Sequence, residues 1–239
     1  MPAGLTDALG WTRDGTTLFL AAADLDEAAL SAPSALPGWT RRHLLAHVAA
    51  NAGALGNLVH WAATGEPTPM YSSPDARAAG IEGGARLPDA ELSAWLRRAA
   101  RALDDAMAAL SDEQWQAPVQ TAQGRTVPAT EVPWLRAREV YVHAVDLATG
   151  PSFAELPAGF CTALCDDVTA KRASARASGP ALALQALDTG GRWELPGQRD
   201  SEPIVLPGPL AEITAYLTGR PHKLTTAGGD PAPALGPWL

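Results

Sequence analysis

Glu139 and His143 stand four residues apart in a stretch whose apolar spacing predicts a helix, residues 134–148. Four helical steps of about 100° return to within roughly 40° of the starting direction, so both side chains project from one face, one turn apart. Such a pair can hold a metal ion. A second histidine, His47, lies in another predicted helix and could add a third ligand. Two imidazoles and one carboxylate leave coordination positions open, as catalytic zinc sites do.

The spacing alone does not require a metal. A glutamate and a histidine at this spacing more often form a solvated interaction on a helix surface, and a histidine in an apolar helix is usually a satisfied core residue. His43 is a rival ligand, because it lies four residues before His47 and the two could form a pair of their own. Asp146 follows Glu139 by seven residues on nearly the same face, where it could hold a ligand in place or contact another domain.

The charge of the chain limits its partners. The 239 residues include 26 acidic and 18 basic side chains, which give a net charge of −8. No basic run could neutralise the phosphates of DNA or RNA, so we expect no nucleic-acid partner. The sequence has no apolar stretch of about 18 residues and no basic signal-peptide start. We therefore expect a soluble cytoplasmic protein without a membrane partner, and, since nothing requires an oligomer, a monomer.

The two cysteines, Cys161 and Cys165, lie four residues apart in a predicted helix. They cannot form a disulfide framework. A catalytic thiol supplied by the chain would need a base beside it, and no histidine stands near these cysteines in the sequence. We predict that both are buried packing residues.

Helical periodicity dominates the first 150 residues, where apolar residues recur at helical spacing in 6–23, 40–63, 88–111 and 130–149. Thr40 is a suitable N-cap for the second helix, and Gly65 is placed to end it. Between 65 and 87 no period is convincing, which predicts a long loop or a broken helix, and long ordered loops are often functional. Four amphipathic helices with one long connection predict a bundle that can hold a metal between facing helices.

The pattern changes after residue 150. Residues 160–178 predict a helix, and short runs bounded by Gly and Pro predict strands at 181–188, 192–195 and 202–206. A last helix over 210–218 ends at Gly219. The fold class is therefore α+β, with a four-helix bundle domain at 1–150 and a smaller C-terminal α/β domain at 151–239.

Four segments, 38–52, 60–77, 121–129 and 138–147, share one family resemblance. They include Gly38-Trp-Thr-Arg-Arg-His-Leu-Leu-Ala-His, Ser73-Pro-Asp-Ala-Arg and Arg138-Glu-Val-Tyr-Val-His-Ala-Val-Asp-Leu. Together they closely resemble the mycothiol-dependent maleylpyruvate isomerases. The resemblance covers most of residues 38–147 and continues more weakly to Arg220 and the final Pro237-Trp-Leu.

This resemblance implies a DinB-like four-helix bundle that binds a divalent metal, normally zinc, and a C-terminal domain that closes over the site. The family's metal ligands match His47, Glu139 and His143, which decides against His43 as a ligand. Its substrate-binding arginines match Arg77, expected in a loop, and Arg220. The expected cofactors are therefore zinc and mycothiol, and the expected substrate is a small dicarboxylate.

The chemistry accounts for these groups. Maleylpyruvate has a cis double bond conjugated to carbonyl groups, and conversion to fumarylpyruvate requires rotation about that bond. If a thiolate adds to the alkene, the bond becomes single, and rotation followed by expulsion of the thiolate gives the trans isomer. Zinc binds soft thiolate and stabilises it near neutral pH. Guanidinium groups match carboxylates with paired donors, so Arg77 and Arg220 are expected to orient the substrate and stabilise enolate charge.

The sequence therefore predicts a zinc- and mycothiol-dependent maleylpyruvate isomerase of gentisate catabolism. Two alternatives remain. One is a transferase that moves mycothiol onto another electrophile, which would release a thioether. The other is a non-catalytic metal-binding or thiol-binding protein. The pair Arg77 and Arg220 favours the isomerase, because a general transferase does not need two groups that bind carboxylates.

Overall fold

The computed structural model describes residues 3–174, 179–197 and 202–236. The chain divides into two compact units, one formed by Ala3–Pro151 and the other by Ser152–Leu239. The first is mainly helical and the second combines helices with a small sheet, so the fold class is a helical bundle with a smaller α+β unit.

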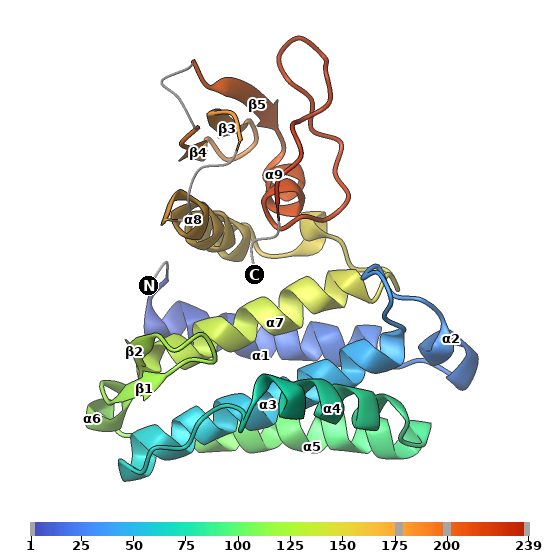
Figure 1. Ribbon diagram of the computed structural model, residues 1–239, viewed down its shortest axis with the longest axis vertical. Helices are drawn as coiled ribbons and strands as arrows, with labels where there is room; N and C mark the ends of the chain where they lie inside the picture. The colour runs from blue at the N-terminus through green and yellow to red at the C-terminus, as the bar shows by residue number, and fades with distance from the viewer. Residues whose placement is uncertain (1–2, 175–178, 198–201, 237–239) are drawn as a thin grey trace. The chain divides into compact units, whose positions relative to one another are not determined.

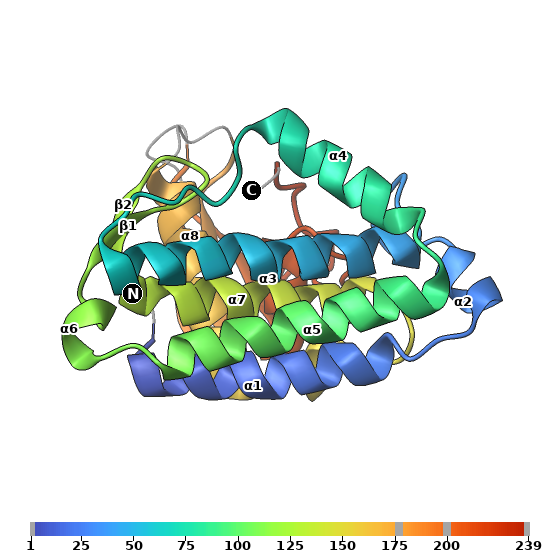
Figure 2. The ribbon, with the colours of Figure 1, turned by 90° about the horizontal axis from the view of Figure 1, so that it is seen from below.

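Four long helices make up the first unit (Figures 1 and 2): α1 (Leu5–Ala22), α3 (Arg41–Thr64), α5 (Asp89–Ala108) and α7 (Val132–Asp146). Helix α1 packs along α7, α7 also packs on α3, and α3 packs along α5, whereas α1 and α5 barely touch. Shorter elements connect them, namely α2 (Glu27–Ser31), α4 (Pro74–Ala85), α6 (Asp112–Trp115), the hairpin of β1 (Pro118–Gln120) and β2 (Thr126–Pro128), and the 3-10 helix η1 (Ala129–Glu131).

The ends of α3 confirm the capping prediction. Thr40 is the N-cap, and Gly65 is the C-cap with a left-handed φ of 77°, a conformation that glycine adopts without steric cost. His43 completes the N-terminal cap, because its Nδ1 accepts a hydrogen bond from the Thr40 backbone amide at 3.2 Å. This cap fixes where α3 begins and so fixes the rotation of His47 about the helix.

The segment 65–87 is not one long loop. It contains helix α4, which begins at Pro74 after the N-cap Ser73, whose hydroxyl accepts a hydrogen bond from the Ala76 amide. The helix has almost no amphipathic stripe because Gly and Ala fill most of its positions, which is why periodicity did not show it. Arg77 therefore lies in the first turn of a helix, and the prediction that it lies in a loop was wrong.

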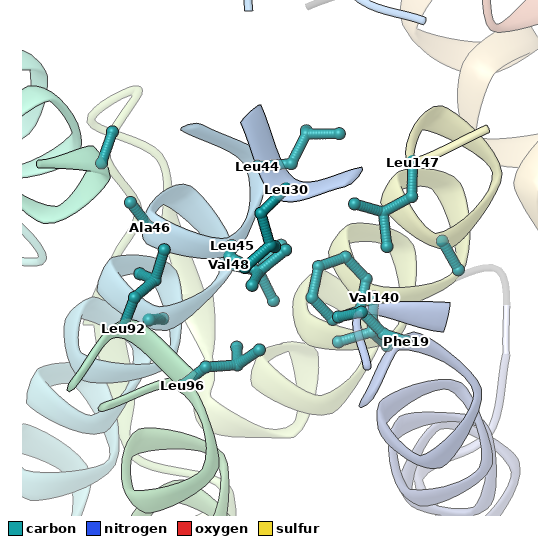
Figure 3. Close-up of a cluster of buried hydrophobic side chains, with 14 of the residues drawn as sticks. Phe19, Leu30, Leu44, Leu45, Ala46, Val48, Leu92, Leu96, Val140 and Leu147 are labelled. Atoms are coloured by element: carbon teal, nitrogen blue, oxygen red, sulfur yellow. The ribbon is translucent and has the colours of Figure 1, made fainter. Parts of the chain in front are cut away.

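Large apolar side chains from all four long helices meet in the interior of the bundle (Figure 3). Phe19 comes from α1, Leu45 and Val48 from α3, Leu96 from α5 and Val140 from α7, and all are buried. Burying one such side chain stabilises a fold by roughly 1.5–3 kcal/mol. The core that joins the four helices is apolar and includes none of the three predicted metal ligands.

Helices α1 and α7 approach each other closely at Gly15. A Cβ atom at this buried position would lie 2.7 Å from Val140 Cγ2 and 3.0 Å from the Tyr141 ring. Only a residue without a side chain fits there. The glycine therefore sets the separation of the two helices.

The second unit contains η2 (Phe153–Glu155), α8 (Ala158–Ser174), β3 (Leu182–Ala186), β4 (Arg192–Leu195), β5 (Ile204–Gly208) and α9 (Leu210–Leu217). The sheet order is β4-β3-β5, with β3 antiparallel to β4 and parallel to β5. The helix predicted over 160–178 is present as α8, although 175–178 lie outside the described residues, as does the Pro237-Trp-Leu end. In the part of the chain that the structure describes, no helix is both long and apolar enough to cross a membrane.

Candidate metal centre

Helices α3 and α7 bring the three predicted ligands together. His47 Nε2 lies 2.8 Å from Glu139 Oε2, and His143 Nε2 lies 3.3 Å from the same oxygen. Among the described residues, His47, Glu139 and His143 form a group whose potential ligand atoms all lie within 4.8 Å of one another. Glu139 and His143, one turn apart on α7, therefore both face His47 on α3.

The geometry fits a divalent ion with nitrogen and oxygen ligands. Ligand atoms about 2.0–2.1 Å from a tetrahedral zinc lie about 3.3 Å from one another. Glu139 Oε2 and His143 Nε2 already have this separation, and small side-chain rotations would open the shorter contact of His47. Three protein ligands leave at least one coordination position for an exogenous group, which distinguishes a catalytic site from a structural one.

Asp146 fixes the orientation of His143. Its carboxylate is fully buried, and its Oδ2 lies 2.8 Å from His143 Nδ1. A carboxylate at that distance accepts the Nδ1 proton, so the neutral imidazole presents the lone pair of Nε2 toward Glu139. Of the two roles that the sequence left open for Asp146, the structure shows a contact with His143, one of the predicted ligands.

His47 is held by packing on its other side. Its ring makes edge contacts with Trp39, at a centroid distance of 5.6 Å, and with His143, at 4.9 Å. Its Nδ1 is buried and has no hydrogen-bond partner among the described residues. Burial lowers the pKa of His47, so the ring is neutral and able to bind a metal at neutral pH.

Glu139 and His143 carry opposite charges without a metal. Burial alone would raise the pKa of Glu139, but hydrogen bonds to His143 and His47 hold it well below its ordinary value. Burial alone would lower the pKa of His143, but hydrogen bonds to Asp146 and Glu139 raise it to about 9. Glu139 is therefore a ready anionic ligand, whereas His143 must lose a proton before its Nε2 can bind an ion.

Arg77 lies in the same unit as the three ligands. The centre of its guanidinium is 6.0 Å from the centre of the Tyr71 ring. Burial is the largest cause of the lowered His47 pKa, and the charge of Arg77 acts in the same direction. The pKa of Tyr71 is raised, mainly by burial and further by the charge of Glu139. Arg77 thus adds positive charge near the cluster, and Tyr71 is a neighbour that the sequence did not single out.

Arg136 is a second residue that the sequence analysis missed. It is only 1% exposed, and its Nη1 donates to the Val48 carbonyl at 2.8 Å and to Asn51 Oδ1 at 2.9 Å. It lies one turn before Glu139 on α7, and the two α3 residues that it contacts follow His47 by one position and by one turn. A charged residue inside an apolar helical stretch, on the same face as a proposed ligand, was the available signal.

Arg220 belongs to the other compact unit, and its role at the site stays a prediction. It follows Gly219, whose φ of 72° ends α9, and its backbone amide donates to the Ala215 carbonyl at 2.8 Å. This closes a Schellman-type turn, as expected from a glycine at the end of a helix. Its Nη1 donates to the Thr218 carbonyl at 2.6 Å.

The remaining histidines of the second predicted helix take other roles. His43 caps α3 and stacks on Trp39, with its Nε2 3.7 Å from Glu82. His60 is exposed near the far end of α3. Neither belongs to the three-residue group of potential ligands that the described residues form.

The two cysteines are inert. Cys161 and Cys165 are buried in α8, and burial raises the pKa of Cys161 to about 11 and that of Cys165 to about 12. Thiols with such pKa values carry almost no thiolate at neutral pH. They are packing residues, as predicted, and a thiol nucleophile would have to come from outside the chain.

Comparison with known proteins points to one family. Residues 11–148 match the model of the mycothiol maleylpyruvate isomerase N-terminal domain. The crystal structure of a mycothiol-dependent maleylpyruvate isomerase is 39% identical, with a TM-score of 0.92 over 99% of this chain and 98% of that chain. A variant of such an isomerase with one histidine replaced by alanine matches at 38% identity and a TM-score of 0.91, over the same shares of the two chains.

A more distant match extends the fold comparison. YfiT from Bacillus subtilis, described as a probable metal-dependent hydrolase with an unusual four-helix bundle topology, is 15% identical with a TM-score of 0.51, over 60% of this chain and 83% of that chain. At this identity the likeness concerns the bundle fold alone. No curated protein matches the chain.

Proposed function

The chain belongs to the family of mycothiol-dependent maleylpyruvate isomerases, and we propose that it converts maleylpyruvate to fumarylpyruvate with mycothiol as its thiol cofactor. The observation that carries this proposal is the full-length match to an isomerase of that kind, with 39% identity over 99% of the chain. The cluster of His47, Glu139 and His143 agrees with it, because an ion held there with an open position could bind and stabilise the thiolate that the reaction needs.

The ligand set supports zinc as the ion. Two imidazole nitrogens and one carboxylate oxygen suit zinc, and its softness suits a thiolate. When bound, zinc and mycothiol would supply the thiolate that adds to the double bond of the substrate, allows rotation and leaves again. Gentisate catabolism as the pathway and the cytoplasm as the location stay predictions.

The residues of the chain prepare the site for this chemistry. Asp146 holds His143 with Nε2 toward the cluster, and burial keeps His47 neutral. Glu139 stays ionised and offsets part of the ion's charge. The fixed positions of these groups mean that little reorganisation is needed when substrate arrives.

We also propose that Arg77 and Arg220 bind the carboxylate groups of the substrate. Arg77 supports this because its charge lies near the cluster and its side chain is only half buried, so it can reach a ligand. Arg220 follows a helix end in the second unit, and the weaker resemblance of the sequence around it to the family supports its role. Guanidinium groups keep their charge at every physiological pH and pair with carboxylates through two donors.

A turnover assay tests the function directly. Purified zinc-loaded protein and mycothiol are mixed with maleylpyruvate, and fumarylpyruvate is followed together with the concentration of free thiol. The proposal predicts that product forms while the thiol is conserved, and that His143→Ala abolishes the reaction. Loss of free thiol into a stable thioether would instead identify a mycothiol transferase, and absence of any conversion would leave a binding protein.

A further inference from the structure

A cavity of about 360 Å³ opens between α1 and α5, within the bundle unit. These two helices run side by side along one side of the bundle (Figure 2) but barely touch. Each packs mainly on another partner, α1 on α7 and α5 on α3. The interface between α1 and α5 is therefore loosely packed, and the cavity lies in this interface.

Arg136 of α7 reaches this cavity from the interior of the bundle. Its Nη1 is satisfied by Val48 and Asn51, but its Nη2 is buried and has no hydrogen-bond partner among the described residues. A buried donor without a partner costs about 1–3 kcal/mol, and more when the group is charged. Arg136, which lines the cavity, thus carries a cationic donor that the fold itself does not satisfy.

No carboxylate in the described part of the chain forms an ion pair with Arg136. Burial lowers its pKa to about 10, so it still carries a charge at neutral pH. Glu139 is the nearby anion, but its Oε2 contacts both His47 and His143 in the metal cluster. A buried cation whose counter-charge is shared with another site attracts an anion.

The mouth of the cavity is also positive. Arg13, Arg97 and Arg101 line it, with Asp104 as a single carboxylate. Arg13 lies 3.8 Å from Asp104, and Arg97 lies 3.8 Å from Asp24. Arg101 forms no ion pair with any described residue. In a chain of net charge −8, this concentration of arginines is a local field that selects anions.

The walls add an apolar surface, formed by Leu20, Ala100, Leu103 and Met107. Inorganic phosphate or chloride would gain nothing from these side chains, whereas a short carbon chain would bury apolar area against them. Volumes of roughly 300–1,000 Å³ are typical of small-molecule sites with a few placed polar groups.

We propose that the cavity between α1 and α5 binds a short organic dicarboxylate, with one carboxylate against the guanidinium of Arg136, the other on Arg101, and the carbon chain against Leu103 and Met107. This site is separate from the metal cluster, and it does not depend on the proposed reaction. It gives the unsatisfied guanidinium a partner.

Calorimetric titration with succinate tests the proposal. The titration uses the full chain carrying Arg77→Ala, so that the arginine near the metal cluster does not contribute. We expect saturable binding of one succinate per chain. Arg101→Glu should weaken this binding at least about tenfold, whereas Arg98→Glu, an equal charge reversal at an exposed position of α5 outside the cavity lining, should change it less than about twofold.

A second variant fills the cavity without changing charge. Ala100→Leu adds volume from the wall and should weaken succinate binding while the thermal transition shows a folded protein. Equal weakening by both charge reversals would reduce the effect to net charge and overturn the proposal. The absence of binding, or tighter binding of inorganic phosphate than of succinate, would overturn it as well.

Discussion

Two helices of this protein carry reactive side chains at the same spacing, Glu139 and His143 on α7 and Cys161 and Cys165 on α8. Both pairs are largely removed from water. On α7 the pKa of Glu139 is held well below its ordinary value, whereas on α8 the thiol pKa values are raised to about 11 and 12. The same four-residue spacing therefore gives a candidate ion site in one helix and buried packing residues in the other.

The neighbours cause the difference. Around α7 the buried groups are polar and face each other, so hydrogen bonds to His143, His47 and Asp146 offset the cost of burial. Around α8 the thiols meet mainly apolar surroundings, apart from the hydroxyl of Thr214 and the carbonyl of Phe153. Burial favours the neutral form wherever no partner stabilises the charge. Spacing sets the geometry, and the partners decide the chemistry.

Loss of a ligand should have the largest effect. His47→Ala, Glu139→Ala and His143→Ala each leave two ligands, which should weaken zinc binding by about 3 kcal/mol, roughly 100-fold, and reduce turnover to background. The apolar core is untouched, so each variant should remain folded. Metal analysis after dialysis and the thermal transition check both statements. Full zinc occupancy and normal turnover in His143→Ala would mean that the pair on α7 does not bind the ion, and the contrast with α8 would be lost.

Arg220→Ala should come next. If this guanidinium holds a charged group of the substrate, its loss should cost about 2–4 kcal/mol of transition-state stabilisation in kcat/KM, with zinc content unchanged. Arg220→Lys should restore little, because an ammonium cannot reproduce two parallel donors. Arg192→Ala, at an exposed position in the same unit, is the matched control. Near-normal kinetics of Arg220→Ala would mean that substrate charge is handled in the bundle unit alone.

Asp146→Asn should have a smaller effect, about tenfold on zinc affinity. The pKa of His143 is raised to about 9, so His143 is protonated at pH 7.5 in the metal-free protein and zinc must displace that proton. Zinc affinity should therefore rise with pH up to about 9. The asparagine removes a cause of the raised pKa, so fewer protons should be released, as measured by calorimetry in buffers of different ionisation enthalpy. The matched control is Asp105→Asn, at an exposed position of α5. If zinc affinity and proton release were unchanged in Asp146→Asn, Asp146 would not act on His143.

Cys161→Ala and Cys165→Ala should change least. Turnover with mycothiol should stay within about twofold of the native value, while the free energy of unfolding should fall by about 1–2 kcal/mol because each variant leaves a small void. Kinetics and denaturant titration measure the two quantities. A stable, zinc-loaded Cys165→Ala protein without turnover would mean that α8 supplies the nucleophile.

The sequence predicted the long helices because their apolar residues repeat at helical spacing, and Thr40 and Gly65 marked the ends of α3 correctly. For residues 65–87 it left a long loop or a broken helix open and did not place α4, since Gly and Ala leave that helix without a stripe, although Ser73 and Pro74 carried a start signal. The hairpin around Gly124 was also missed, because its strands have only three residues each. Short elements are stabilised by contacts with distant parts of the chain, and the local sequence pattern does not show these contacts.

The candidate site was predictable only in part. Spacing placed Glu139 and His143 on one face, but it could not choose between His43 and His47, which required a family resemblance. Tyr71 and Arg136 were not identified, because their importance comes from neighbours that are far away in the sequence. A single chain read in order shows which residues share a helix face, but not which helix that face meets.

Gly15 is a position where substitution would be harmful, although it is not itself one of the predicted ligands. The residues that leave no room for a Cβ there, Val140 and Tyr141, stand between Glu139 and His143 on α7. Adding one methyl group would push that helix and displace both ligands relative to His47. In a random mutagenesis screen scored for turnover, this glycine would behave as an essential residue, although it binds nothing. Substitution of Gly15 would therefore reduce turnover in the same way as substitution of a residue in the site itself.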